Sequence, residues 1–320
     1  MIPLSKIRAA AGRIAGKVHR TPLFSSTGLG ELLGARLFLK CENFQKTGSF
    51  KPRGALNKVL SLSPEERARG LVTVSAGNHA QALAWAARIA GAACTVVMPS
   101  GAPQSKIEAT RGYGAEIVLH DDRATLFDKL AEVRDARGLV FIPPFDDPEI
   151  IAGAGTTGVE ILEDLPDAEI LLVPVGGGGV LAGIASAVKH LRPQTKVVGV
   201  ELAEGPGLAP ALAAGTPVTV TRPWGTLADG MTPPFVGALP LEIAKEAVDE
   251  VVGVSEAGII EAMKLLMTRA KLYVEGAGAA STAALLEGKV RVPGATKVVA
   301  LVSGGNVDLS RIGSGLHLPH

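Results

Sequence analysis

Lys51 stands in a setting that would suit a nucleophilic amine. It follows Gly48-Ser49-Phe50 and precedes Pro52-Arg53-Gly54-Ala55, after which apolar residues recur at helical spacing. The pattern places Lys51 at a loop-to-helix junction, where the positive end of the helix dipole and the charge of Arg53 both disfavour protonation. A lysine whose pKa is lowered can form a Schiff base. On spacing alone, a solvated surface lysine is the commoner alternative.

Residues 75–79, Ser-Ala-Gly-Asn-His, lie between an expected strand and an expected helix. Backbone amides in such a loop can converge on an anion, with the helix dipole behind them. That geometry would suit the carboxylate of a substrate. Simple N-capping by Ser75 or Asn78, worth about 1 kcal/mol, is the alternative.

Four consecutive glycines, Gly176–Gly179, follow another apolar run and open a helix at Val180. Residues without side chains let consecutive amides close on a phosphate at a helix N-terminus. A dinucleotide site is a serious alternative, because the segment also matches G-x-G-x-x-A and Glu201 ends the next strand. Taken alone, the segment fits a dinucleotide and a monophosphate equally well.

The elements that must position these segments alternate between apolar strands and amphipathic helices, which predicts an α/β protein with parallel sheets. A proline-rich stretch at 143–148 predicts a domain crossing, and further proline-rich loops are expected over 206–240. The expected strands span 71–75, 94–98, 116–119, 139–142, 170–175, 196–201, 250–254 and 297–302. The expected helices include one near 7–14, those after Lys51 and Ser63, and 80–90, 104–112, 125–137, 157–165, 180–190, 241–247, 259–269 and 279–286.

Composition indicates a globular protein with a small-molecule partner. The chain has 320 residues, 47% of them hydrophobic and 20% charged, and a net charge of +1, which argues against disorder and against nucleic-acid binding by bulk charge. Only Cys41 and Cys94 are cysteines, so a reducing cytoplasm fits better than a disulfide framework. Residues 170–188 carry no charge, but Pro174 and the four glycines argue against a membrane-spanning helix.

Residues 42–55 read Glu-Asn-Phe-Gln-Lys-Thr-Gly-Ser-Phe-Lys-Pro-Arg-Gly-Ala. The segment from Lys40 to Ala55 resembles the cofactor-lysine segment of the fold-type-II pyridoxal-phosphate enzymes, in particular the serine/threonine dehydratase and serine racemase group. The similarity extends from Thr21-Pro22 to the stretch Ser303–Arg311, and several stretches look closest to short, catabolic-type threonine dehydratases.

The resemblance implies a tryptophan synthase beta-like fold, with two open, twisted, mostly parallel sheets flanked by helices and pyridoxal 5'-phosphate in the cleft between two domains. It also implies that residues 1–69 and 147–320 form a large cofactor-binding domain, into which a small α/β domain, 70–146, is inserted. Lys51 would be the catalytic residue and would bond to the cofactor. The other assignments are cofactor binding by Phe50, Asn78, Gly176, Gly177, Gly178, Gly179, Val180, Gly230 and Ser303, and substrate binding by Ser75, Ala76, Gly77, Asn78 and His79.

Two further positions match the resembled family in part. Glu275 fits a family position, although a helix-capping carboxylate is an equal alternative. Some relatives bind a divalent cation through a glutamate, a backbone carbonyl four residues on and an aspartate two further. Glu201 and Gly205 fit that pattern, but Gly207 replaces the acid, so no dedicated metal site is expected.

Ala76 favours elimination over racemisation. Racemases of the group typically have a serine there, and an alanine cannot exchange a proton. The sequence therefore predicts dehydration and deamination of L-threonine, L-serine or both to a 2-oxo acid and ammonia. The alternatives are another β-hydroxy amino acid such as hydroxyaspartate, a serine racemase, an NAD-dependent oxidoreductase and a non-catalytic amino-acid sensor.

A cytoplasmic homodimer or homotetramer without nucleic-acid or membrane partners is expected. Fourteen residues follow Asn306, so no C-terminal regulatory domain of the longer dehydratases is expected.

Overall fold

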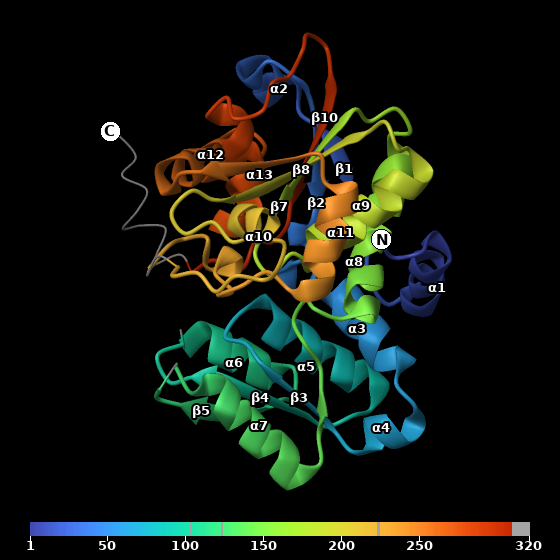
Figure 1. Cartoon of the computed structure of the whole chain (residues 1–320), viewed down its shortest axis with the longest axis vertical. Helices are drawn as coiled ribbons and strands as arrows, with labels where there is room; N and C mark the ends of the chain where they lie inside the picture. The colour runs from blue at the N-terminus through green and yellow to red at the C-terminus, as the bar shows by residue number, and fades with distance from the viewer. Residues whose placement is uncertain (103, 123, 223–224, 309–320) are drawn as a thin grey trace.

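The strands of the computed structural model form two separate sheets (Figure 1). Residues 1–102, 104–122, 124–222 and 225–308 are described; Leu309, Ser310 and Arg311, which end the family resemblance, lie outside them. The larger sheet has the order β1-β2-β10-β7-β8-β9, and only the β1–β2 pair is antiparallel. Its strands are β1 Leu23–Ser25, β2 Arg36–Cys41, β7 Ile170–Pro174, β8 Lys196–Leu202, β9 Glu250–Val254 and β10 Lys297–Val302.

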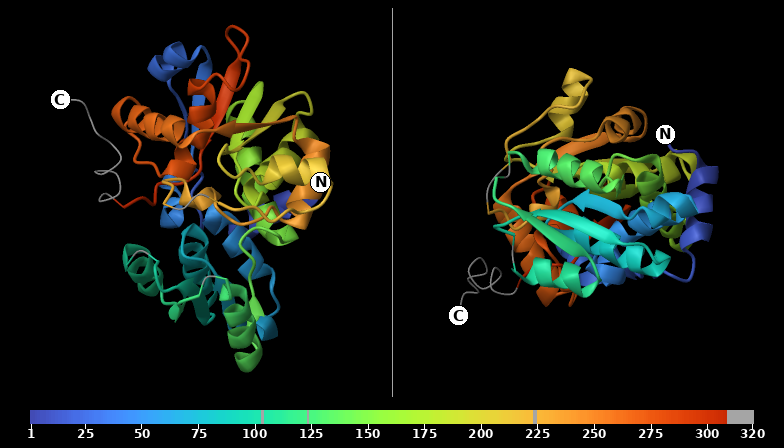
Figure 2. Two further views of the ribbon diagram at one scale, coloured as in Figure 1. Left: turned by 60° about the vertical axis from the view of Figure 1, so that its left-hand side comes forward. Right: turned by 90° about the horizontal axis from the view of Figure 1, so that it is seen from below.

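The smaller sheet has the order β5-β4-β3-β6 and is parallel throughout. Its strands are β3 Leu71–Val74, β4 Cys94–Pro99, β5 Glu116–His120 and β6 Val140–Phe141. The predicted α/β class with two mostly parallel sheets is therefore confirmed, and Figure 2 shows from other directions that the sheets occupy different parts of the molecule. The division into domains at residues 70 and 146 stays a prediction.

Helices cover both faces of the larger sheet. Because successive side chains of a strand point to opposite faces, Leu171 and Val173 join one core cluster while Ile170 and Leu172 join the other. A sheet buried on both faces needs continuous apolar strands, which is why the charge-free run 170–175 is so long. The first face carries α1 Leu4–Ile14, α8 Pro148–Asp164, α9 Gly179–Leu191, α10 Leu208–Ala214 and α11 Ala238–Ala247. The second carries α2 Thr27–Leu33, α12 Glu256–Thr268 and α13 Gly276–Leu286.

The smaller sheet is likewise packed between helices. One face packs against α3 Lys51–Ser61, α5 Asn78–Ala90 and α6 Gln104–Gly112. The other face packs against α7 Leu126–Arg137. The short helix α4, Pro64–Ala68, begins with the capping box of Ser63 and Glu66. Since α3 packs on both α5 and α8, it joins the two parts of the molecule, and it carries Lys51 at its first turn.

Helix α8 is the main departure from the expected elements. It begins at Pro148, nine residues before the expected start at Thr157. The Asp147 carboxylate caps it by accepting the N–H groups of Glu149 and Ile150, and Pro148 suits the first helical position. The glycines of its first half made this segment a poor helix by propensity, but close packing against α3 and α9 requires them.

The remaining expected helices and strands begin and end within three residues of the observed ones. Sequence patterns did not indicate β1, β2, α2 or α10, and α10 lies inside the expected loop region 206–240. Residues 170–188 form β7, the glycine turn and most of α9. No helix among the described residues is long and apolar enough to cross a membrane.

Gly183 lets α9 approach α8 closely. A Cβ on Gly183 would collide with the carbonyl oxygen of Ile151 and lie 2.6 Å from the amide nitrogen of Gly155. We expect Gly183→Ala to lower the free energy of unfolding by about 1–3 kcal/mol, because both obstacles are backbone atoms. Urea unfolding measures this loss.

The matched control is Gly12→Ala in α1. Gly12 is exposed, and nothing lies within 4 Å of an added Cβ, so a gain of about 0.5–1 kcal/mol is expected from helix propensity. Equal stabilities of Gly183→Ala and the unsubstituted protein would contradict the close packing of the two helices.

Candidate active site

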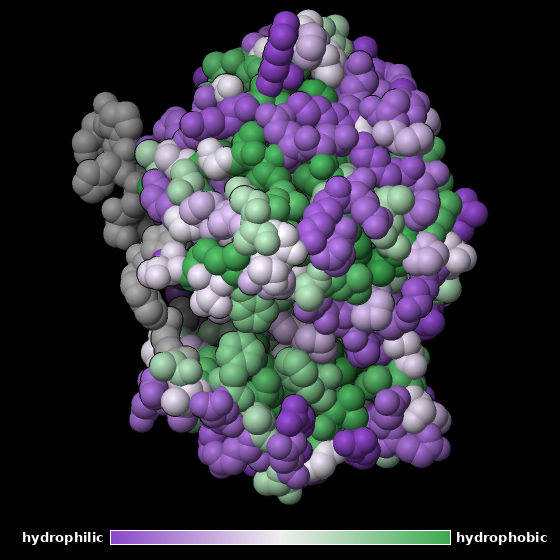
Figure 3. All heavy atoms as spheres, in the orientation of Figure 1, coloured by the Kyte–Doolittle hydropathy of each residue, from purple (hydrophilic) through white to green (hydrophobic). Residues whose placement is uncertain are grey.

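The predicted site segments meet at the carboxyl ends of the strands, where open α/β sheets place their ligands. Strand β10 lies between β2 and β7, so the segments that follow these three strands are neighbours. Ser49 forms an antiparallel bridge with Gly304, and the Phe50 N–H donates to the Ser303 carbonyl at 3.1 Å. On the face shown in Figure 3, a furrow bordered by apolar and weakly polar side chains separates the parts built on the two sheets.

Lys51 is the first residue of α3, and its amine points to the segment that returns from the smaller sheet. Its Nζ donates to the Pro144 carbonyl at 2.8 Å and lies 5.1 Å from the centroid of the Phe50 ring. Burial lowers the pKa of Lys51 to about 8, against an opposing effect of Glu275. The pKa has the predicted direction, but burial rather than the charge of Arg53 is the main cause, and that charge is neutralised by partners of its own.

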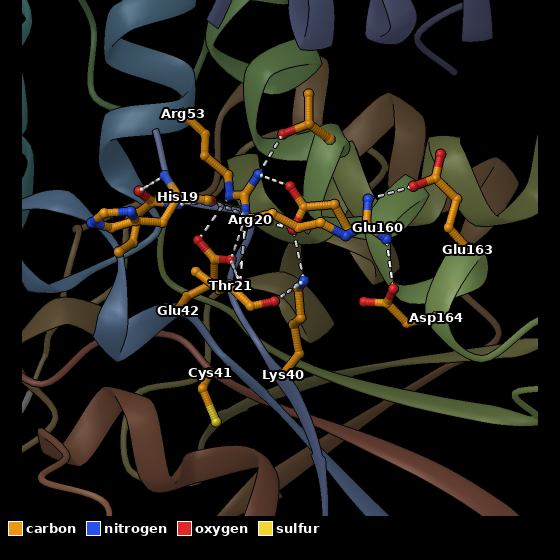
Figure 4. Close-up of polar contacts among 12 residues, drawn as sticks. His19, Arg20, Thr21, Lys40, Cys41, Glu42, Arg53, Glu160, Glu163 and Asp164 are labelled. Carbon is orange, nitrogen blue, oxygen red and sulfur yellow. Dashed lines mark hydrogen bonds and ion pairs between the residues drawn. The ribbon is translucent and has the colours of Figure 1, made fainter. Parts of the chain in front are cut away.

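Arg53 belongs to a buried network of four charged side chains (Figure 4). Arg53 donates to both carboxylate oxygens of Glu42 at 2.8 and 2.9 Å, and to both of Glu160 at 2.6 and 2.8 Å. Lys40 donates to Glu160 at 2.6 Å and to the Thr21 carbonyl at 2.8 Å. Two cations and two anions thus balance, and they join β2, α3 and α8 next to Lys51.

Glu42 shows how strongly this network holds its charges. Its side chain is fully buried, and it also accepts the Thr21 hydroxyl at 2.5 Å. Burial alone would raise the pKa of Glu42, but Arg53 and Thr21 bring that pKa below its ordinary value. The carboxylate therefore stays ionised, as a buried acid does only when it is fully paired.

A chain of amide and carboxylate groups links the start of α5, the start of α13 and the segment that follows β10. Asn78, at the start of α5, donates to Glu275 at 2.7 Å and accepts from Asn306 at 2.8 Å. Glu275 is the N-cap residue of α13, but its side chain makes no capping hydrogen bond. The capping alternative for Glu275 is therefore wrong, and its carboxylate faces the cleft residues instead.

Glu275 has an unusual protonation equilibrium. Burial and the nearby Asp229 raise the pKa of Glu275 to about 7, although Lys106, Asn78 and the Asn306 N–H favour its ionised form. Lys106 reaches Asp229 across the cleft, with 2.5 Å between Nζ and Oδ2. The Glu275 carboxyl can therefore hold or release a proton near neutral pH.

His79 is buried in α5, and its Nε2 lies 3.2 Å from the Ile142 carbonyl. Because a carbonyl can only accept, Nε2 carries the proton. Burial and the charge of Lys51 lower the pKa of His79 to about 3, so the ring stays neutral. Its ring is thus engaged by backbone, while Ser75, Ala76 and Gly77 form the turn before the helix.

The glycine turn fits against its neighbours with no room for side chains. A Cβ on Gly176 would lie 2.8 Å from the Gly230 carbonyl oxygen. Gly178 has a φ of +89°, a left-handed conformation that favours glycine, and a Cβ there would lie 2.7 Å from the Cβ of Pro240. The turn leads into α9 at Gly179, and the first N–H groups of a helix have no partner within it. Such a turn can hold a phosphate through its backbone amides.

Gly230 and Ser303 lie in the same cleft. A Cβ on Gly230 would be 3.1 Å from the Cβ of Ala277 and 3.9 Å from Oε1 of Glu275. The Ser303 hydroxyl donates to the Ala277 carbonyl at 3.2 Å and is buried. Ala277 therefore contacts both residues.

Sequence reasoning missed three contributors to the cleft: the Pro144 carbonyl, Lys106 and the side chain of Asn306. The stretch 143–148 was interpreted only as a domain crossing, although two prolines beside Phe145 also predict a rigid segment. Nothing in the spacing of Lys106 and Asp229 indicates that they pair, because they are 123 residues apart.

Glu201 and Gly205, the two weak candidates for metal binding, form hydrogen bonds with other groups of the protein. The Glu201 carboxylate accepts the N–H groups of Gly207 and Leu208 at 2.7 Å and of Ala209 at 3.1 Å, which caps α10. The Gly205 carbonyl accepts from the Arg222 guanidinium. Across the described ranges, no group of three or more His, Cys, Asp or Glu side chains is placed to hold a metal ion.

The fold and the site define a pyridoxal-phosphate enzyme. The chain matches the family described as pyridoxal-phosphate dependent enzyme over residues 14–304, and it belongs to that family. It is 46% identical to the L-threonine ammonia-lyase of Thermotoga maritima over 317 residues, covering 98% of this chain and 77% of the relative. It is 45% identical to the catabolic L-threonine dehydratase TdcB of Escherichia coli K12, covering 97% of this chain and 95% of that protein.

Solved structures agree with this membership. A maize serine racemase superposes with a TM-score of 0.92 at 37% identity, covering 97% of this chain and 95% of the other. The threonine deaminase isoform 2 of Solanum lycopersicum, in its processed form, superposes with a TM-score of 0.91 at 34% identity, covering 99% and 92%. The predicted family, fold and cofactor are thus confirmed.

The residues present in the cleft fit pyridoxal phosphate. The glycine turn, which has no room for a Cβ, can take the phosphate. The amine of Lys51, with its lowered pKa, can bond to the carbonyl carbon of the cofactor. Asn78 and Ser303 add a side-chain amide and a hydroxyl for the polar edges of the ring.

The Arg53 network predicts a large loss on removal of one charge. Glu160→Ala leaves Lys40 and Arg53 buried with one carboxylate between them, so we expect the free energy of unfolding to fall by about 3–5 kcal/mol. The control is Glu163→Ala on the same helix, which removes an exposed pair with Arg20 and should lower stability by less than about 1 kcal/mol. Denaturant unfolding of the two variants tests the difference; equal losses would refute the importance of the buried pairs.

Glu275 predicts a pH-dependent stability. Its pKa is raised from 4.5 unfolded to about 7 folded, so the folded state is penalised as pH rises through that interval. Relative to the unsubstituted protein, Glu275→Gln should gain up to about 3 kcal/mol of stability between roughly pH 4.5 and pH 8. Urea unfolding of the cofactor-free proteins measures this gain, with exposed Glu31→Gln as the control. A pH-independent difference would contradict the raised pKa.

Proposed function

We propose that this chain is an ammonia-lyase that converts L-threonine, L-serine or both to a 2-oxo acid and ammonia. Identities of 45–46% to a threonine ammonia-lyase and a catabolic threonine dehydratase, over 97–98% of this chain, carry the proposal. The geometry supports it, because the cleft presents the amine of Lys51, with its lowered pKa, and has Ala76 in the proposed substrate loop.

When bound, pyridoxal phosphate supplies an electron sink that makes the α-proton of an amino acid acidic. The amine of Lys51 removes that proton, since a pKa of about 8 leaves about a tenth of it unprotonated at pH 7, far more than for an ordinary lysine. The Pro144 carbonyl orients Nζ by accepting its hydrogen bond.

The remaining polar residues bind and orient. Residues 75–79 hold the substrate carboxylate through backbone amides at the start of α5. Asn78 is fixed for the cofactor ring by its bonds to Glu275 and Asn306. Gly176–Gly179 and Val180 would hold the phosphate, Phe50 and Gly230 would line the ring, and the Ser303 hydroxyl would offer a hydrogen bond to it.

Elimination needs one base, whereas racemisation needs a second one on the opposite face. Ala76 has no exchangeable proton, which supports elimination. The likeness to a maize serine racemase keeps racemisation as the second candidate. Another β-hydroxy amino acid such as hydroxyaspartate stays an alternative substrate. We further propose a homo-oligomeric, cytoplasmic enzyme whose domains divide at residues 70 and 146.

The decisive assay is 2-oxo acid formation by the purified, cofactor-loaded protein. We expect 2-oxobutyrate and ammonia from L-threonine, and pyruvate from L-serine. Lys51→Ala should reduce turnover by about a thousandfold or more, because the proton acceptor is lost. Exposed Lys17→Ala is the control and should retain full activity.

The same reactions are analysed for D-serine. D-serine formed faster than pyruvate would favour the racemase. Turnover retained in Lys51→Ala would contradict the assignment of the base, and a loaded protein that forms no oxo acid from either substrate would contradict the proposed substrates.

A further inference from the structure

The segment Pro144–Asp147 returns the chain from the smaller sheet to α8 and borders the cleft. The Pro144 carbonyl accepts the amine of Lys51. The Asp146 carboxylate accepts the N–H groups of Ala238 and Leu239, both at 3.0 Å, which caps α11. Asp147 caps α8. The segment is therefore fixed at its two ends and in its middle, which leaves Phe145 with a defined position.

Phe145 packs directly on the glycine turn. A Cβ on Gly177 would lie closer than 3.0 Å to three atoms of the Phe145 ring, and a Cβ on Gly179 would lie 3.0–3.1 Å from the Phe145 backbone and Cβ. Phe145 is only 8% exposed. Gly177 and Gly179 thus present their bare Cα atoms to Phe145.

The Phe145 ring is itself supported from behind. Phe235 meets it edge to face, with 5.8 Å between ring centroids and an interplanar angle of 70°. The Gly177 carbonyl accepts the N–H of Gly237 at 3.1 Å, so the turn is also tied to the start of α11. The backbone of the turn is therefore held between an aromatic pair and a helix N-terminus.

We propose that Phe145 is a positioning residue for the cofactor phosphate: its ring sets the conformation of the glycine turn and so aims the backbone amides. This inference rests on the proposed placement of the phosphate at Gly176–Gly179. A turn of four glycines has little conformational preference of its own. The Phe145 ring against Gly177, together with the Phe145 backbone and Cβ against Gly179, removes that freedom before the ligand arrives, which raises affinity.

The proposal predicts an effect on phosphate recognition rather than on the fold alone. Phe145→Ala should weaken binding of pyridoxal 5'-phosphate to the cofactor-free protein by about tenfold, as expected for one charge-assisted hydrogen bond made poorly. Pyridoxal, which lacks the phosphate, should bind Phe145→Ala and the unsubstituted protein equally. Phe145→Leu keeps part of the side chain, so its affinity for pyridoxal 5'-phosphate should lie between those of Phe145→Ala and the unsubstituted protein.

A size exchange between Phe145 and Gly177 is the sharper test. Gly177→Ala adds a methyl group that the Phe145 ring cannot accommodate, so it should also weaken cofactor binding by about tenfold or more. The double variant Gly177→Ala with Phe145→Ala gives the methyl group the vacated space, and it should recover affinity relative to Gly177→Ala alone. Exposed Phe127→Ala is the control for loss of a phenyl ring and should leave both affinities unchanged.

Absorbance titration of the cofactor-free proteins measures every dissociation constant, and circular dichroism checks the fold. A folded Gly177→Ala that binds the cofactor normally would contradict the phosphate site, and with it this part of the proposed function. Weakened binding in Gly177→Ala without recovery in the double variant would overturn only the role of Phe145. If Gly177→Ala does not fold, the single Phe145 variants decide: unchanged affinity for pyridoxal 5'-phosphate, or equal losses for it and for pyridoxal, overturns the proposal.

Discussion

The buried pairing of Arg53 with Glu42 and Glu160 is the interaction on which the rest of the cleft depends. It fixes the first turn of α3 between the end of β2 and the middle of α8, and Lys51 lies two residues before Arg53. Removing four charges from water is unfavourable unless every one is paired, so the network disfavours arrangements of these elements that leave a charge unpaired. Lys40 completes the balance of charge. The amine of Lys51 thus sits beside a neutral cluster, and burial is the main influence on its basicity.

The two parts of the molecule are joined by a mixture of apolar packing and a few long-range polar contacts. Helix α3 packs on α5 and α8, while Asn78 reaches Glu275 and Lys106 reaches Asp229 across the cleft. Polar contacts across an interface exchange with water more readily than an apolar core does.

Much of the arrangement was predictable, and the exceptions have physical causes. Parallel strands buried on both faces produce long apolar runs, so residues 170–175 and 297–302 were identified closely. The first half of α8 was missed because its glycines lower helix propensity, and the packing that requires them involves α3 and α9, which are separate segments of the sequence. The Arg53–Glu160 and Lys106–Asp229 pairs join residues 107 and 123 positions apart, and no local pattern encodes such contacts.

The position of β10 has a consequence for how the chain folds. The smaller sheet is built from one continuous stretch, residues 71–141, so its strands can pair as soon as that stretch exists. The larger sheet instead has its last strand, residues 297–302, between β2 and β7. On the ribosome, β2 must therefore wait for roughly 250 further residues before its parallel neighbour is made. Until then, the edges of β2 and β7 that will pair with β10 keep unpaired N–H and C=O groups beside apolar side chains. This interval is when the nascent chain most needs protection from aggregation.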